Sequence, residues 1–168
     1  MNAETERPIP LSYWVKPGDL LAGPYPGARS EERAREKLQR FRDAGITYFV
    51  DLTEEGEMPP YRSLLMGWAG HSRMPIPDFD VVPEEEMRRI LDLIDRRLFK
   101  GDSVYVHCLG GQGRTGTVVG CYLVRHGMSG QEALERVRQL RQVTPFPESP
   151  SPETEAQRRM VLSWEEGQ

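Results

Sequence analysis

Residues 104–124 read VYVHCLGGQGRTGTVVGCYLV, a strand pattern joined to an apolar helix pattern by a glycine-rich turn. Val104, Tyr105 and Val106 are residue types that favour strands, and the predicted strand covers 103–107. The predicted helix begins at Arg114 and runs to about 126, with apolar side chains on nearly every side. A helix of that composition belongs in the centre of a molecule, so this stretch predicts a buried strand–turn–helix unit.

Further strands and helices alternate around this unit. Strands are predicted at 13–15, 20–23, 46–52 and 72–76, and helices at 31–44, 83–99, 130–141 and 152–164, with a weaker helical pattern at 61–68. Ser30, Ser129 and Ser151 are the predicted N-caps of three of these helices. This alternation predicts an α/β fold with a central, mostly parallel sheet flanked by helices on both sides.

The composition predicts a single soluble domain covering residues 1–168. Hydrophobic residues make up 38% and charged residues 29% of the chain, a common balance in globular domains. The longest apolar stretch, 118–124, is far shorter than the roughly 20 residues that span a bilayer. The N-terminal residues are polar and show no leader pattern, so we expect a cytoplasmic protein without a membrane partner. A net charge of −4 argues against nucleic acid as a partner. No oligomeric state is predicted.

The two cysteines, Cys108 and Cys121, lie in the strand–turn–helix unit. Neither a CxxC nor an HxxxH spacing occurs in the chain, which excludes a disulfide framework and a zinc site of the usual kinds. Cys121 falls in the apolar helix and is interpreted as a packing residue. Cys108 ends the strand and precedes the glycines, so it is the candidate for chemistry.

The turn after Cys108 has the composition of an anion-binding loop. Glycines permit the backbone to turn successive N–H groups inward, and the start of the following helix adds a positive dipole. Arg114 adds a planar guanidinium that can hold two phosphate oxygens. The predicted phosphate-binding residues are Leu109, Gly110, Gly111, Gln112, Gly113 and Arg114.

The same positive groups favour the thiolate form of Cys108. A thiolate that faces a bound phosphoryl group can attack phosphorus and form a phosphocysteine. The loop N–H groups and Arg114 would stabilise the transition state, without a metal or a cofactor. The Thr115 hydroxyl is placed to stabilise the departing thiolate, and His107 to orient the loop by bonding a backbone carbonyl.

The segment HCLGGQGRTG resembles the signature of the protein tyrosine phosphatase superfamily, and the chain is similar in length and layout to its dual-specificity branch. Residues 73–123 look most like the kinase-associated phosphatases and small bacterial relatives. MPIPDFDVVPEEE resembles the acid loop of that branch. The resemblance implies a general acid on this loop, with Asp78 in the matching position and Asp80 as the alternative.

Several interpretations of function stay open from the sequence. The leading hypothesis is dephosphorylation of a phosphoprotein partner at phosphotyrosine, and alternatively at phosphoserine or phosphothreonine. A phosphoinositide, an inositol phosphate or an RNA 5′ phosphate is the alternative substrate. A binding module for phosphorylated residues and a redox enzyme of the arsenate-reductase type are the alternatives from other classes. Asp51, Glu54, Glu55 and Glu57 either border the pocket or are solvent-exposed loop residues.

Overall fold

The computed structural model describes residues 6–168. Residues 1–5, which belong to the N-terminal segment interpreted as lacking a leader, lie outside the described part. The elements follow in the order β1 (Tyr13–Lys16), β2 (Leu20–Gly23), α1 (Glu31–Asp43), β3 (Tyr48–Asp51), the 3₁₀ turn η1 (Arg62–Leu65), β4 (Gly70–Arg73), α2 (Glu84–Phe99), β5 (Val104–His107), α3 (Gly113–Arg125), α4 (Gly130–Leu140), the 3₁₀ turn η2 (Arg141–Val143) and α5 (Glu155–Ser163).

The five strands form one mixed sheet in the order β1-β2-β5-β3-β4. Only β1 pairs antiparallel, with β2, and the other three pairings are parallel. The predicted class, an α/β fold with a mostly parallel sheet flanked by helices, is confirmed. Gly23, Asp51, Arg73 and His107 end the four parallel strands in one register. Ligand sites of open parallel sheets lie outside this carboxyl edge.

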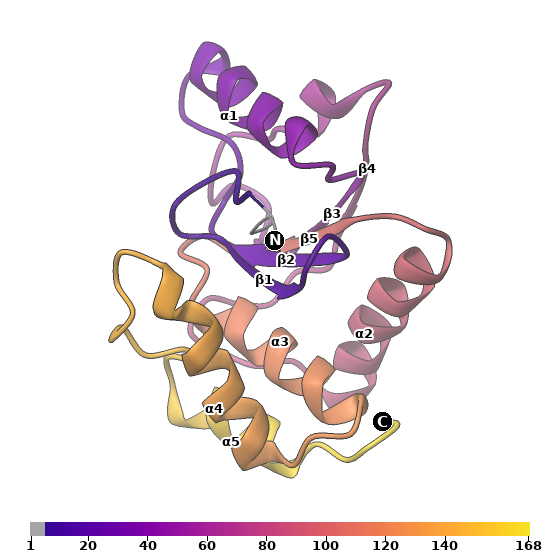
Figure 1. The fold of residues 1–168 in the computed structure, drawn as a ribbon, viewed down its shortest axis with the longest axis vertical. Helices are drawn as coiled ribbons and strands as arrows, with labels where there is room; N and C mark the ends of the chain where they lie inside the picture. The colour runs from indigo at the N-terminus through magenta and orange to yellow at the C-terminus, as the bar shows by residue number, and fades with distance from the viewer. Residues whose placement is uncertain (1–5) are drawn as a thin grey trace, which may run out of the picture.

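Helices cover both faces of the sheet (Figure 1). On one face, Leu38 and Phe41 of α1 pack against Phe49 and Tyr105 of the sheet. On the other face lie α2, α3, α4 and α5, and their apolar side chains share a core with strand residues such as Val106. Neighbouring strand residues therefore point to opposite cores, which explains why the central strands are apolar without interruption.

Most predicted boundaries lie within two residues of the observed ones, and three predicted elements differ for clear physical reasons. The strand expected at 72–76 is β4 at Gly70–Arg73, because Pro75 and Pro77 lack the N–H groups that a longer ladder requires. The helical pattern at 61–68 forms only the turn η1. The last helix begins at Glu155 and not at 152, and its N-cap is Thr154 rather than Ser151. Thr154 takes that role because its hydroxyl and the Gln157 side chain form a reciprocal capping box.

Within residues 6–168, no helix has both the length and the apolar character needed to cross a bilayer.

Candidate active site

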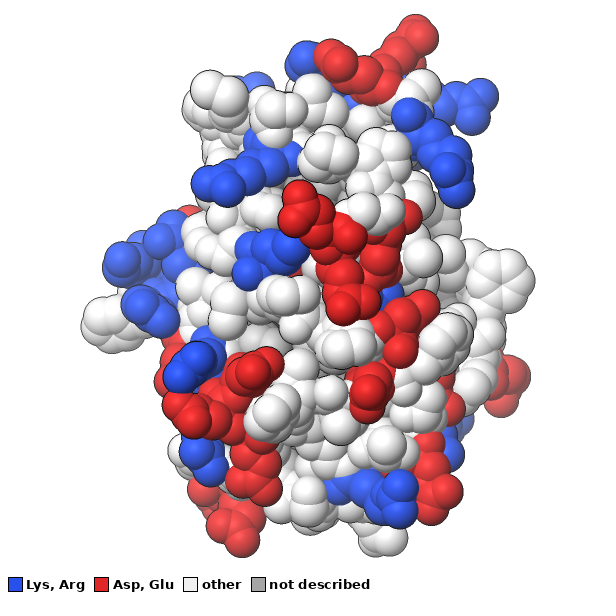
Figure 2. All heavy atoms as spheres, turned by 180° about the vertical axis from the view of Figure 1, so that it is seen from behind, with Lys and Arg blue, Asp and Glu red and all other residues white. Residues whose placement is uncertain are grey.

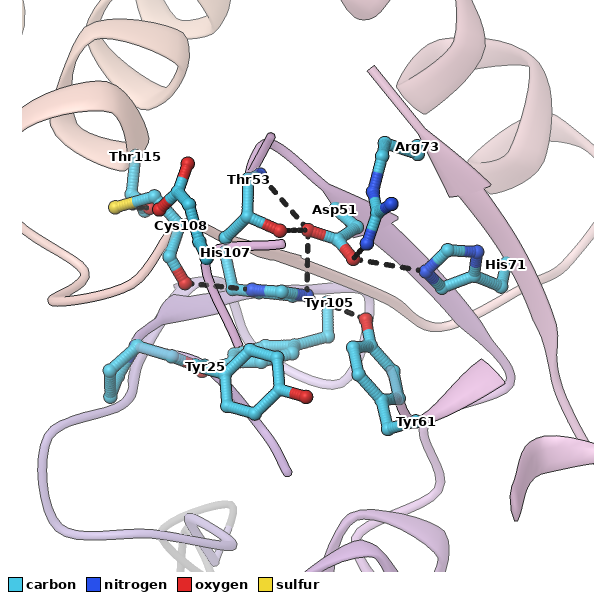
Figure 3. Close-up of polar contacts among 12 residues, drawn as sticks. Tyr25, Asp51, Thr53, Tyr61, His71, Arg73, Tyr105, His107, Cys108 and Thr115 are labelled. Carbon is cyan, nitrogen blue, oxygen red and sulfur yellow. Dashed lines mark hydrogen bonds and ion pairs between the residues drawn. The ribbon is translucent and has the colours of Figure 1, made fainter. Parts of the chain in front are cut away.

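Cys108 follows β5 directly and is only 3% exposed. Its Sγ accepts a hydrogen bond from the Thr115 hydroxyl at 3.0 Å and another from the Gly111 N–H at 3.2 Å. Hydrogen bonds to a charged acceptor are about twice as strong as those to a neutral one, so both donors would stabilise negative charge on Sγ. Cys108 and Thr115 lie side by side in Figure 3.

The carbonyl groups of the loop are bonded to partners outside it. The donors are His107 Nδ1 to the Cys108 carbonyl (2.9 Å), the Tyr25 N–H to the Leu109 carbonyl (3.0 Å) and the Ser151 hydroxyl to the Gln112 carbonyl (2.6 Å). In a trans peptide the C=O and the following N–H point in opposite directions. The N–H groups of Leu109, Gly110 and Gly113 therefore turn away from these partners. An anion-binding loop requires its N–H groups to be directed away from the partners of its carbonyls in this way.

Arg114 lies in the first turn of α3 and is 1% exposed. Its two terminal nitrogens donate to both carboxylate oxygens of Glu57, at 2.6 and 2.9 Å, and one also donates to the Ile76 carbonyl at 3.0 Å. Its Nε has no partner among the described residues. A buried donor without a partner costs free energy, and a bound phosphate oxygen would satisfy it. The outer edge of the guanidinium is thus fixed by protein, and Nε is left for a ligand.

Glu57 comes from the loop after β3, and its side chain is 16% exposed. The hydrogen bonds from Arg114 keep the pKa of Glu57 below its ordinary value, although partial burial opposes the shift. The carboxylate is therefore ionised at neutral pH. Glu57 positions Arg114 by a bidentate contact, which fixes the plane of the guanidinium.

The two candidate acids differ in what they contact. Asp78 Oδ1 lies 3.3 Å from a terminal nitrogen of Arg114, and the Asp78 side chain is 50% exposed. The Asp80 carboxylate accepts a hydrogen bond from the Val81 N–H of its own loop, at 2.8 Å. The Asp78 carboxylate likewise accepts a hydrogen bond from the Phe79 N–H, at 3.0 Å, so what distinguishes the two residues is the contact of Asp78 with Arg114.

His107 lies behind Cys108 and is completely buried. Because a carbonyl only accepts, Nδ1 carries the proton that bonds the Cys108 carbonyl, and Nε2 accepts from the Tyr61 hydroxyl at 2.6 Å. Burial lowers the pKa of His107 to about 4, although the nearby Asp51 carboxylate opposes the shift. His107 is therefore neutral at pH 7 and acts on the loop through a fixed tautomer.

Asp51 ends β3 and lies at the centre of the polar network in Figure 3. It accepts hydrogen bonds from the Thr53 hydroxyl and N–H, at 2.5 and 3.0 Å, and from His71 at 3.1 Å. Burial by itself would raise the pKa of Asp51, but the hydrogen bonds from His71 and Thr53 lower it below the ordinary value. A charged Asp51 is thus held 3.8 Å from His107 Nε2.

The C-terminal helix reaches the same site through Gln157, which is fully buried. Its amide nitrogen donates to the Asp80 carbonyl at 3.2 Å. Its amide oxygen would lie 3.0 Å from a Cβ atom placed on Gly113. Gln157 therefore ties the acid loop to the start of α5 and packs directly against the phosphate loop.

A model of the family described as "Swiss Army Knife protein, DSP-PTPase phosphatase domain" matches residues 10–162. The chain belongs to this family. It lies in the dual-specificity branch of the protein tyrosine phosphatase superfamily, and the resemblance stated from HCLGGQGRTG is confirmed.

Two curated relatives place this DSP-PTPase chain among phosphatases with different substrates. Phosphatidylglycerophosphate phosphatase PTPMT2 of Arabidopsis thaliana is 31% identical over 110 residues, which cover 64% of this chain and 48% of that protein. Dual specificity protein phosphatase CDC14B of Mus musculus is 28% identical over 120 residues, which cover 67% of this chain and 24% of that protein. The chain thus spans about half or less of the length of these relatives.

Solved structures share the fold of this chain. Tk-PTP in its active form superposes with a TM-score of 0.78 and 28% identity, covering 93% of this chain and 97% of that one. Kinase associated phosphatase, with its catalytic cysteine replaced by serine, gives a TM-score of 0.74 at 19% identity, covering 89% of each chain. The second likeness is one of fold alone.

Sequence reasoning about this DSP-PTPase domain left Glu57, Asp51 and His71 without assigned roles. For Glu57, the sequence left two alternatives, a residue at the border of the pocket or an exposed loop residue. In the structure its carboxylate accepts hydrogen bonds from Arg114. Asp51 is buried, so the interpretation as an exposed loop residue is wrong. His71 bonds Asp51. The available signal was position, because polar residues that follow parallel strands gather at one edge of a sheet.

Gly111 offers a sharp test of the loop geometry. It has φ +75°, and a Cβ atom on it would lie 2.5 Å from the Gly23 carbonyl carbon. We expect Gly111→Ala to lower the free energy of unfolding by about 1–3 kcal/mol and aryl phosphatase activity at least about tenfold. Denaturant titration and steady-state rates measure the two effects.

Gly110→Ala is the matched control, since a Cβ atom on Gly110 would have no neighbour within 4 Å and the φ of this residue is outside the left-handed region. We expect this variant to keep stability and rate close to wild type. Equal losses in the two variants would mean that general loop flexibility, and not the contact with Gly23, governs this position.

Proposed function

We propose that this chain hydrolyses phosphomonoesters of proteins, phosphotyrosine first and phosphoserine or phosphothreonine as well, through a phosphocysteine intermediate. One observation carries the proposal. Cys108 Sγ, with two hydrogen-bond donors on it, lies in a loop that opens α3 beside a buried arginine whose Nε has no partner within residues 6–168. A nucleophile and a phosphate clamp are thus held by the same turn.

In the first step, the Cys108 thiolate attacks phosphorus and the bond to the leaving oxygen breaks. The leaving oxygen takes a proton from Asp78, and a phosphocysteine remains. Arg114 and the loop N–H groups stabilise the charge on the three other phosphoryl oxygens.

In the second step, a water molecule attacks the phosphocysteine and gives a proton to the Asp78 carboxylate. The phosphorus–sulfur bond breaks, and inorganic phosphate and the Cys108 thiolate are released. The Thr115 hydroxyl and the Gly111 N–H stabilise this thiolate as it leaves. His107 holds the Cys108 carbonyl throughout, and so keeps the strand end and the loop in fixed relative positions.

The first test is hydrolysis of an aryl phosphate at mildly acidic pH with a chelator present, followed by phosphopeptides and inositol phosphates at equal concentration. The proposal expects chelator-resistant activity and a higher kcat/KM for phosphopeptides. Loss of activity with the chelator would instead indicate a metal enzyme.

A lipid or inositol phosphate is the second candidate, because PTPMT2, named for a phospholipid phosphatase activity, is 31% identical to this chain. A clear preference for phosphatidylglycerophosphate or an inositol phosphate over phosphopeptides would establish it in place of the first. The loop residues Leu109 to Gly113 include no lysine or arginine that would favour such polyanions.

Asp78→Ala separates the two candidate acids. Loss of a general acid matters most when the leaving group is a poor one, because a good one departs without a proton. We expect kcat for phenyl phosphate to fall about 10²-fold or more, and kcat for p-nitrophenyl phosphate to fall much less. Asp80→Ala is the matched control on the same loop and should keep both rates. The opposite result would assign the general acid to Asp80: the loss of rate in Asp78→Ala would not depend on the leaving group, whereas the loss in Asp80→Ala would.

A further inference from the structure

Carboxylates surround the phosphate loop on several sides. Glu57 and Asp78 contact Arg114 directly, at 2.6 and 3.3 Å. Glu57 also accepts a hydrogen bond from the Glu54 N–H at 2.7 Å, which folds the Glu54–Glu57 segment back beside the site. A carboxylate oxygen of Glu153 would lie 3.1 Å from a Cβ atom on Gly113. We call the acidic rim the three carboxylates placed there, Glu57, Asp78 and Glu153, together with the exposed residues Glu54, Glu55 and Asp80 of the same two loop segments.

Few cations offset the acidic rim. The segments 53–60, 77–82, 109–113 and 149–154, which border the loop, contain no lysine or arginine. Segment 24–30 contains Arg29, and the Lys37 ammonium group already donates to the Tyr25 and Gly27 carbonyls of that segment. Arg73 and Arg158 lie near but already have partners, Asp51 for the first and the carbonyls of Pro152 and Glu153 for the second. Figure 2 shows acidic side chains gathered in the middle of one face of the molecule, with Lys or Arg side chains beside them on one side.

The acidic rim lies beside the Arg114 guanidinium, which has one nitrogen available to an anion. Arg114 is 1% exposed, and its Nε has no partner in the described part of the chain while its other nitrogens contact two members of the rim. The centre of the site therefore suits one phosphoryl group, and its surroundings repel further negative charge. A substrate with several phosphates would place its extra charges against the rim, whereas lysine or arginine beside a phosphorylated residue would be attracted.

We infer that the acidic rim selects phosphorylated protein segments with basic residues next to the phosphorylated residue. This inference rests on the proposed function and narrows its substrate class. In water, the Coulomb energy between one unit charge on the substrate and a rim carboxylate about 6 Å away is enough to change kcat/KM about threefold. Salt screens this effect. A substrate with two basic residues next to the phosphorylated residue should therefore have at least about tenfold higher kcat/KM than one with two acidic residues there.

The test compares two phosphotyrosine peptides that differ only in having two lysines or two glutamates beside the phosphotyrosine, with an aryl phosphate measured in parallel. We expect the lysine peptide to have at least about tenfold higher kcat/KM at low salt, and the ratio to shrink towards one in high salt. The double variant Glu54→Gln/Glu55→Gln should reduce the low-salt ratio about threefold or more.

The matched control is Glu165→Gln/Glu166→Gln, which removes two adjacent exposed carboxylates at the other end of α3, where Gly167 bonds the Arg125 carbonyl. It should leave the peptide ratio unchanged. Equal kcat/KM for both peptides at low salt would overturn the rim inference and leave the proposed function standing. Hydrolysis of the aryl phosphate but of neither peptide, or a preference for an inositol phosphate, would overturn both.

Discussion

Cys108→Ser is expected to lower kcat for aryl phosphate hydrolysis by at least about 10⁴-fold, because a serine hydroxyl in this loop is not ionised and has no general base beside it. The groups that bind phosphate are the loop N–H donors and Arg114, and the substitution leaves them in place. Affinity for inorganic phosphate, measured by calorimetry, should therefore stay within a few-fold of wild type.

Cys121→Ala is the control for this experiment. Cys121 is free and fully buried on α3, and burial raises the pKa of its thiol above the ordinary value. Its removal leaves a small cavity but no unpaired polar group, so we expect a modest loss of stability and a rate near wild type. Retained turnover in Cys108→Ser would exclude the phosphocysteine mechanism. Loss of both turnover and phosphate binding would point to a collapsed loop.

Arg114→Lys should be nearly as severe, with kcat/KM reduced about 10³-fold or more. A lysine keeps the charge but supplies one nitrogen in place of three. It cannot reach both oxygens of Glu57, the Ile76 carbonyl and a phosphate at the same time. We expect kcat to fall and KM to rise together, since the arginine acts both in binding and on the transition state.

Arg125→Lys is the control for Arg114→Lys. Arg125 ends α3 and also contacts two carboxylates, those of Asp92 and Asp95. Because these contacts are far from the phosphate loop and partly solvated, this variant should lose little activity. A mild effect of Arg114→Lys, comparable to that of Arg125→Lys, would mean that charge alone is enough and that the bidentate geometry is unimportant.

Features formed by residues that follow one another in the chain were predictable from the sequence. The strand, the glycine turn and the start of α3 follow one another without interruption, so local propensities and the glycine pattern specify them together. The mostly parallel sheet followed from the alternation of strands and helices. Asp78 was placed by resemblance, and its contact with Arg114 supports that placement.

The long-range contacts were not predictable. Glu57 and Arg114 are 57 positions apart, and their pairing depends on the path of the loop after β3, which no periodic pattern describes. Asp51 and His71 meet because β3 and β4 are neighbours in parallel register, a pairing that a single sequence does not specify. Ser151 has the residue type of an N-cap, but its hydroxyl bonds the Gln112 carbonyl, so a tertiary contact overrides the local preference.

The bonds from Ser151 and Gln157 have a consequence for how this protein is made. Synthesis proceeds from the N-terminus, so the nucleophile and its arginine leave the ribosome well before the residues that fix the Gln112 carbonyl and the acid loop. The sheet and α3 can assemble first, but the geometry around Cys108 is complete only when α5 has docked. A nascent chain therefore exposes Cys108 and Arg114 before the contacts from Ser151 and Gln157 can form, and these contacts form only after the C-terminal part of the chain has docked.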